Sequence, residues 1–114
     1  MLKALFKEKF ALPLNEVKRR HEYEDSQYID IQGMQVHYRD IGEGPVLLLL
    51  HGMFSSLHTW EDWINILKKD FRIIALDSPN YGFTGAHPKG MYKHIYSDFL
   101  NEFTDALEIK ECML

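Results

Sequence analysis

The sequence contains one short run that few folds can accommodate. Residues 46–50 read VLLLL, with no polar position, and they are bounded by Gly42, Gly44 and Pro45 on one side and by a His-Gly pair on the other. Five residues are too few for a helix, so the run predicts a strand that is buried on both faces. Such a strand needs covering layers on both sides, which indicates a layered α/β domain.

An amphipathic helix and a second apolar strand follow this run. Thr59 is a suitable helix cap, and residues 71–76 form a mostly apolar strand after the helix. The side chains that share one helical face are Trp60, Trp63, Ile64 and Leu67. We expect both tryptophans in the core, not on a stacking surface. The length of the 46–77 unit is that of a βαβ crossover, which predicts two parallel neighbouring strands with the helix on one face.

Further elements flank this unit. Alternating runs at 28–32 and 35–41 predict a hairpin, and the almost wholly polar residues 18–27 predict a linker before it. After the unit, a second amphipathic helix places on one face the side chains of Ile95, Phe99, Phe103 and Leu107, widened by Tyr96 and Leu100. The closing residues 112–114 predict the start of another buried strand.

The first residues form a separate basic segment. Residues 1–20 carry six basic and two acidic side chains, although the whole chain has a net charge of −4. Apolar side chains recur at helical spacing up to Pro13, which predicts a short amphipathic helix. Such a helix more often packs on its own domain than on a membrane surface. We therefore expect an appended arm and linker over 1–27 and a folded unit over 28–114.

Charge and composition exclude several functional classes. The net charge of −4, without a basic stripe, disfavours nucleic acid as a partner. The longest apolar run, at 46–50, is far shorter than the roughly 20 residues that cross a bilayer. The single cysteine, Cys112, cannot form an intramolecular disulfide, which favours a reducing compartment. We expect a cytoplasmic protein, with residues 1–13 as the segment suited to peripheral membrane contact.

Two loops after the predicted strands hold the most informative residues. They read HGMFSS from His51 and DSPNYGFTG from Asp77, and loops at the carboxyl ends of strands form the sites of open α/β sheets. A hairpin, a strand ending in His-Gly, a helix start reading SLHTW and a strand ending in Asp-x-Pro-x-x-Gly-x-Thr together resemble the α/β-hydrolase superfamily over residues 28–114. The resemblance implies an incomplete α/β-hydrolase sheet, similar to the amino-terminal part of an esterase or lipase.

The resemblance also implies roles for the first loop. In that family a backbone N–H from this loop helps to form the oxyanion hole, and the matching position is Met53. A main-chain amide can donate to the developing oxyanion whatever its side chain. His51, Gly52 and Phe54 would support the loop: the histidine by bracing loops and not as a base, the glycine by a sharp turn with positive φ.

The second loop is expected to be structural. The residues that match the family pattern are Asp77, Pro79, Gly82 and Thr84. In the family this loop shapes the cavity wall and holds adjacent loops through side-chain to backbone bonds. The usual Pro-Gly is altered at Asn80, but asparagine tolerates the left-handed conformation, so the turn should survive. Tyr81 and Phe83 are candidates to line a pocket.

The nucleophile of the family is missing from these residues. No Gly-x-Ser-x-Gly pattern occurs, and the resemblance places that elbow about four residues past Leu114, with the acid and the base later still. Nothing in the sequence places a base and an acid beside the serines at 55, 56, 78 and 97. We expect no nucleophile, acid or base in this chain, and no activity from it alone.

Other chemistries find less support. The six histidines show no close pair at the spacing of a helical metal site, and Gly42 and Gly44 precede a strand instead of following one, unlike a phosphate-binding loop. We expect neither metal nor cofactor.

Three functional hypotheses remain. The first is an amino-terminal fragment of a serine esterase or lipase, which would act on a small ester only if the missing half is supplied. The second is a fragment of a haloalkane dehalogenase or of an epoxide hydrolase. It ranks lower, because Met53-Phe54 matches neither the Asn typical of the dehalogenases nor the Phe-Pro typical of the epoxide hydrolases. The third is a non-catalytic α/β module that binds a complementing chain along the sheet edge left open next to residues 46–50.

Overall fold

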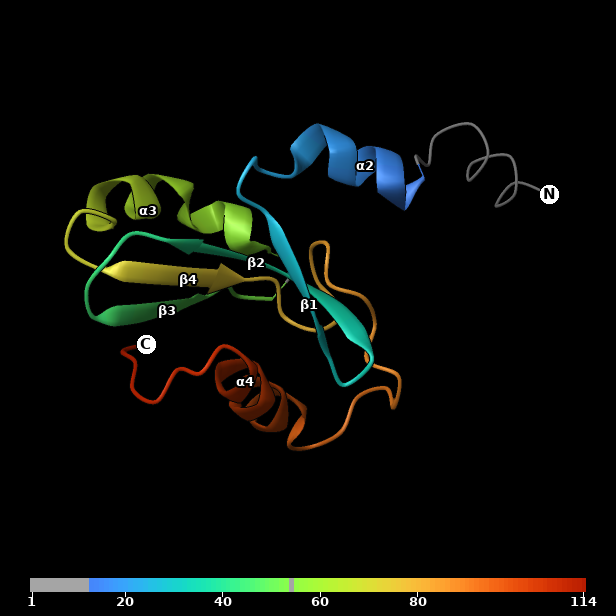
Figure 1. Cartoon of the computed structure of the whole chain (residues 1–114). Helices are drawn as coiled ribbons and strands as arrows, with labels where there is room; N and C mark the ends of the chain where they lie inside the picture. Colours follow the sequence, from blue (N-terminus) through green and yellow to red (C-terminus); the bar gives the residue numbers. More distant parts are fainter. Residues whose placement is uncertain (1–12, 54) are drawn as a thin grey trace.

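The computed structural model describes residues 13–53 and 55–114, and it shows a mixed sheet with helices on both faces (Figure 1). The strands, in the spatial order β1-β2-β4-β3, are β1 Gln27–Ile31, β2 Met34–Ile41, β4 Arg72–Leu76 and β3 Val46–Leu50. The helices are α2 Leu14–His21, the 3-10 helix η1 Leu57–Trp60, α3 Glu61–Leu67 and α4 Ile95–Ala106. In Figure 1, α3 covers one face of the sheet and α4 the other. The expected α/β class is confirmed.

The predicted hairpin is present. Strands β1 and β2 pair antiparallel, with Ile31 opposite Met34. The connecting residues, Gln32 and Gly33, both have positive φ, at 54° and 84°. A two-residue turn of this kind matches the right-handed twist of the strands that it joins.

The predicted βαβ unit is also present. Strands β3 and β4 run parallel, with Val46 opposite Arg72 and Leu50 opposite Leu76. Strand β4 is an inner strand, because β2 pairs with its other side in antiparallel orientation, and β3 lies at the edge of the sheet. The loops that follow β3 and β4 therefore leave the same edge of the sheet.

Each face of the sheet has its own core. On one face, Phe99 and Phe103 of α4 pack on strand side chains that include Val36 and Leu48. On the other face, the core consists of Leu57, Ile64, Ile73 and Ala75. The apolar face predicted for the second helix is confirmed, since its buried residues are Ile95, Phe99 and Phe103.

The helix after β3 differs from the prediction in two ways. It begins earlier, as a 3-10 turn whose cap is Ser56 and not Thr59. The expectation that Trp63 is a core residue is wrong, because its side chain is 57% exposed. Helix α3 has only two turns, and Ile64 points toward the sheet with Leu57, so the adjacent Trp63 is directed away from it.

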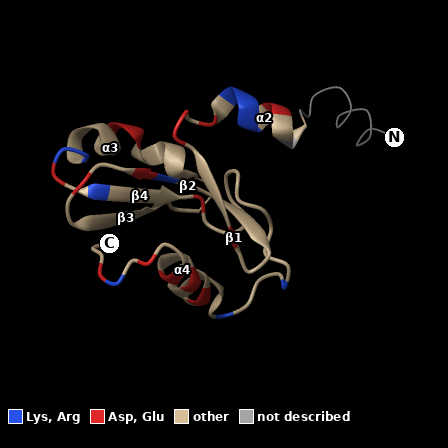
Figure 2. Ribbon diagram, in the orientation of Figure 1, with Lys and Arg blue, Asp and Glu red and all other residues tan. Residues whose placement is uncertain are grey.

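The segment predicted as a linker contains structure. Helix α2, which starts directly after Pro13, runs through Lys18, Arg19 and Arg20, the blue patch in Figure 2. Asp25 and Ser26 form hydrogen bonds with side chains of β2, so the segment is not the plain linker that its polar composition predicts. Propensity rules missed this because the contacts come from β2, which is distant in the sequence. The helix predicted over 1–13 lies outside the described residues, and the division of the chain at residue 27 stays a prediction.

The chain ends beside β3. Met113 forms a parallel bridge to Leu47, in which Leu48 N–H donates to the Met113 carbonyl at 2.8 Å and Met113 N–H donates to the Val46 carbonyl at 3.0 Å. Residues 112–114 thus begin to pair as predicted, but the expectation that they are buried is wrong, since Met113 and Leu114 are exposed. Cys112 is exposed. Within the described residues, no helix is long and apolar enough to cross a membrane.

Candidate active-site pocket

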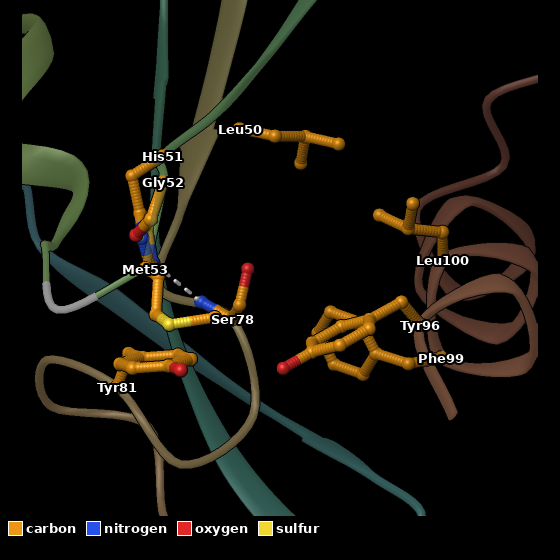
Figure 3. A pocket seen from close by; sticks show the side chains of 9 residues that line it. All are labelled: Leu50, His51, Gly52, Met53, Ser78, Tyr81, Tyr96, Phe99 and Leu100. Atoms are coloured by element: carbon orange, nitrogen blue, oxygen red, sulfur yellow. Dashed lines mark hydrogen bonds between the residues drawn. The ribbon is translucent and has the colours of Figure 1, made fainter. Parts of the chain in front are cut away.

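A pocket lies where the loops after β3 and β4 face helix α4 (Figure 3). Its volume is about 280 Å³. The residues that line it are Leu50, His51, Gly52, Met53, Ser78, Tyr81, Tyr96, Phe99 and Leu100. The two loops singled out in the sequence are therefore brought together, and α4 supplies the opposite wall. No Asp, Glu, Lys or Arg side chain is among these lining residues, so the pocket suits neutral groups.

His51 links the two loops. The Ser78 N–H donates to His51 Nε2 at 3.0 Å, the dashed line in Figure 3. Because Nε2 accepts this bond, Nδ1 carries the proton and donates to the Gly52 carbonyl at 2.8 Å. The ring also meets Tyr81 edge to face, with centroids 5.6 Å apart. With both nitrogens bonded to the backbone, His51 is placed to brace the loops.

The first loop follows the expectation only in part. Met53 is 74% exposed and lines the pocket, and its role as the oxyanion donor stays a prediction. Gly52 does not have a positive φ, and a Cβ there would meet nothing within 4 Å. The expected conformational need for glycine at this position is therefore wrong. Phe54 lies outside the described residues.

Asp77 is the centre of the second loop. Its side chain is fully buried at the end of β4. One carboxylate oxygen accepts from Leu57 N–H at 2.8 Å, while the other accepts from Phe83 N–H at 2.9 Å and bonds His37 Nδ1 at 2.8 Å. Burial alone would raise the pKa of Asp77, but the hydrogen bonds from His37, Phe83 and Leu57 outweigh it and hold the pKa below its ordinary value. An ionised carboxylate thus ties together η1, β2 and the loop.

The rest of the second loop is shaped around this carboxylate. Thr84 Oγ1 donates to the Asp77 carbonyl at 2.6 Å and accepts from His37 N–H at 3.1 Å. Gly82 has a φ of +54°, and a Cβ at this position would overlap the Asp77 carboxylate. Asn80 adopts a φ of 72°, which confirms that the turn survives without the usual glycine. Pro79 is buried within the same loop.

The pocket also contains residues without a predicted role. Tyr81 lines it as expected, whereas Phe83 is buried and borders a different hollow, next to His58. Tyr96 and Leu100 were identified only as the margin of a helix face, because the loop that α4 would oppose could not be known. Burial and the neighbouring Tyr81 raise the pKa of Tyr96 above its ordinary value. A tyrosine hydroxyl is a hydrogen-bond donor at neutral pH.

Sequence reasoning missed a buried polar chain behind the pocket. His37 Nε2 lies 2.7 Å from Ser26 Oγ, and its Nδ1 contacts Asp77. The only signal was a histidine at an inward position of an alternating strand. Among the residues that the structure describes, no three His, Cys, Asp or Glu side chains gather as metal ligands. The absence of metal and cofactor stays a prediction.

The order of strands and the two loops at one sheet edge define an α/β hydrolase core. The sequence model of the alpha/beta hydrolase fold matches residues 45–113. The chain belongs to this family.

Relatives include enzymes of several types. The chain is 36% identical over 52 residues to a pimeloyl-acyl-carrier-protein methyl ester esterase from Vibrio parahaemolyticus, covering 46% of this chain and 20% of the relative. It is 30% identical over 86 residues to human epoxide hydrolase 4, covering 72% of this chain and 24% of the relative. A solved meta-cleavage product hydrolase from Pseudomonas fluorescens superposes with a TM-score of 0.69 at 32% identity. The superposition covers 75% of this chain and 33% of that hydrolase. The chain thus spans between a fifth and a third of the length of these proteins.

Proposed function

We propose that this chain supplies the oxyanion side of a carboxylic ester hydrolase, with Met53 N–H as the donor and with the nucleophile, acid and base outside the chain. The observation that carries the proposal is the place of Met53: in the loop that directly follows β3, at a pocket without charged side chains that α4 borders on the other side. A backbone donor at this place can stabilise the charge that develops on a carbonyl oxygen. By itself the chain should not turn over.

The pocket supports a substrate that is neutral and partly apolar. Leu50, Phe99 and Leu100 provide apolar walls, and Figure 3 shows the Ser78 oxygen directed into the space between them and the Tyr96 oxygen directed toward Tyr81. The esterase relative agrees with an ester as substrate, and the His51 brace would keep the two loops at the separation that the donor needs. A lipase-like preference for long acyl chains rests on the family resemblance alone.

An epoxide hydrolase fragment is the second candidate. The match to human epoxide hydrolase 4 covers 72% of this chain, against 46% for the esterase. The absence of Phe-Pro after His51-Gly52 speaks against it. Both enzymes would use the same pocket.

A fusion tests the proposal. Residues 1–114 are joined to the part of the Vibrio esterase that follows its matched segment, and hydrolysis of p-nitrophenyl acetate and of styrene oxide is measured. Met53→Pro removes the N–H, whereas Met53→Ala retains it and is the matched control. We expect ester hydrolysis, with kcat lowered about 10²- to 10³-fold by the proline. Equal, measurable rates for the two variants would contradict the oxyanion role. Turnover of styrene oxide by a parallel fusion to the corresponding part of human epoxide hydrolase 4, without an active esterase fusion, would favour the second candidate.

The expected partners also remain proposals. A complementing chain would pair along the outer edge of β3, where Met113 already makes two backbone hydrogen bonds. A non-catalytic binding module would use the same edge. A cytoplasmic location and weak membrane contact through residues 1–13 rest on the sequence pattern.

A further inference from the structure

The turn at residues 23–26 is fastened to β2 at several points. Tyr23 N–H donates to Ser26 Oγ at 2.8 Å, and Ser26 N–H donates back to the Tyr23 carbonyl at 3.1 Å. Arg39 of β2 bonds Asp25 at 2.8 and 3.2 Å, and its guanidinium lies 3.8 Å from the centre of the Tyr23 ring. His37, two residues before Arg39 and on the same face of β2, forms a hydrogen bond with Ser26 through its Nε2.

The direction of each hydrogen bond in this chain of groups can be assigned. The Asp77 carboxylate can only accept, so His37 Nδ1 carries the proton, and in the neutral ring Nε2 is then the acceptor. The Ser26 hydroxyl is the donor within reach, at 2.7 Å, and its oxygen in turn accepts from Tyr23 N–H. Every donor therefore points toward Asp77, an arrangement in which neighbouring hydrogen bonds strengthen one another.

The arrangement has the order of a Ser-His-Asp triad, but its surroundings do not suit a nucleophile. A catalytic histidine must pass the serine proton to a leaving group. His37 is fully buried, and its ring contacts the rings of Tyr28 and Phe83, with centroids 5.1 and 5.2 Å away. No leaving group could reach it there.

We infer that Ser26 is a positioning residue: through His37 it orients the Asp77 carboxylate, and so it helps to hold the loop that carries Ser78 and Tyr81 at the pocket. The same carboxylate fixes Phe83 N–H in that loop and Leu57 N–H at the start of η1. The 23–26 turn is therefore a support of the pocket from the opposite side of β2. Its consequence for catalysis rests on the proposed function, but the coupling itself does not.

Amide hydrogen exchange and histidine ¹⁵N spectra of the full chain test this coupling. Ser26→Ala removes the donor, Ser26→Thr retains it, and Ser97→Ala, on the exposed side of α4, is the matched control. In Ser26→Ala we expect the His37 Nε2 resonance to move and exchange at Phe83 and Leu57 to accelerate roughly five- to tenfold, as for the loss of about one net hydrogen bond. Amides of β4 correct for global unfolding, and threonine should restore both readouts.

Two results would overturn the inference. One is a result for Ser26→Ala in which only signals of the 23–26 turn change, while amide exchange at Phe83 and Leu57 does not. Asp77 would then hold its loop without Ser26. The other is covalent labelling of Ser26 by a fluorophosphonate probe, detected by peptide mass spectrometry, because a reactive serine would be a nucleophile. If Ser26→Ala does not fold, Ser26→Cys keeps a weak donor and permits the same comparison. Neither result bears on the Met53 donor.

Discussion

Replacement of Asp77 by asparagine should strongly destabilise the fold. The carboxylate offers two acceptor oxygens to three buried donors: Leu57 N–H on one oxygen, and Phe83 N–H and the His37 ring on the other. An amide offers one oxygen and turns its NH2 toward at least one of these donors. At about 1–3 kcal/mol for each buried donor left unpaired, and with the charge lost, we expect the unfolding free energy to fall by about 2–5 kcal/mol.

Urea unfolding followed by circular dichroism measures this loss. The matched control is Asp105→Asn on the exposed side of α4, which should change the unfolding free energy by less than about 0.5 kcal/mol. The pH dependence adds a second criterion. Because the native pKa of Asp77 is lowered, its contribution is complete above the ordinary carboxyl range and is lost as the pH falls below about 4. The gap between wild type and Asp77→Asn should therefore narrow at acid pH. A variant as stable as wild type at pH 7 would refute the reasoning.

Three further changes test other parts of the fold by the same assay. Gly82→Ala places a Cβ against the Asp77 carboxylate at a φ of +54° and should cost more than about 2 kcal/mol, whereas Gly85→Ala, which has open space, should cost less than about 1 kcal/mol. Phe103→Ala should cost about 3–5 kcal/mol, because its side chain is fully buried between α4 and the sheet. Trp63→Ser should change stability by less than about 0.5 kcal/mol; a large loss would show that its 57% exposed ring is packed in solution.

Features that depend on residues close together in the sequence were predicted correctly, and features that depend on distant contacts were not. The hairpin, the parallel pair β3 and β4 and the buried face of α4 were predicted because hydrophobic period and turn residues act between near neighbours in sequence. Trp63 was misplaced because a two-turn helix can rotate its apolar face, and the contact of Ile64 with Leu57 decides the rotation. The need for glycine at position 52 was misjudged, because the loop after β3 turns there without a positive φ.

The sequence by itself determined the class of the domain, the order of its elements and the two loops that follow the parallel strands, since these depend on local pattern and on a motif of fixed spacing. Only the tertiary structure decided what Asp77 does, because its partners Leu57, Phe83 and His37 come from three separate segments. The same holds for Ser26, which lies in a polar stretch that reads as a linker until β2 places His37 against it. A buried carboxylate must find donors, and their identity depends on which strands the sheet brings together.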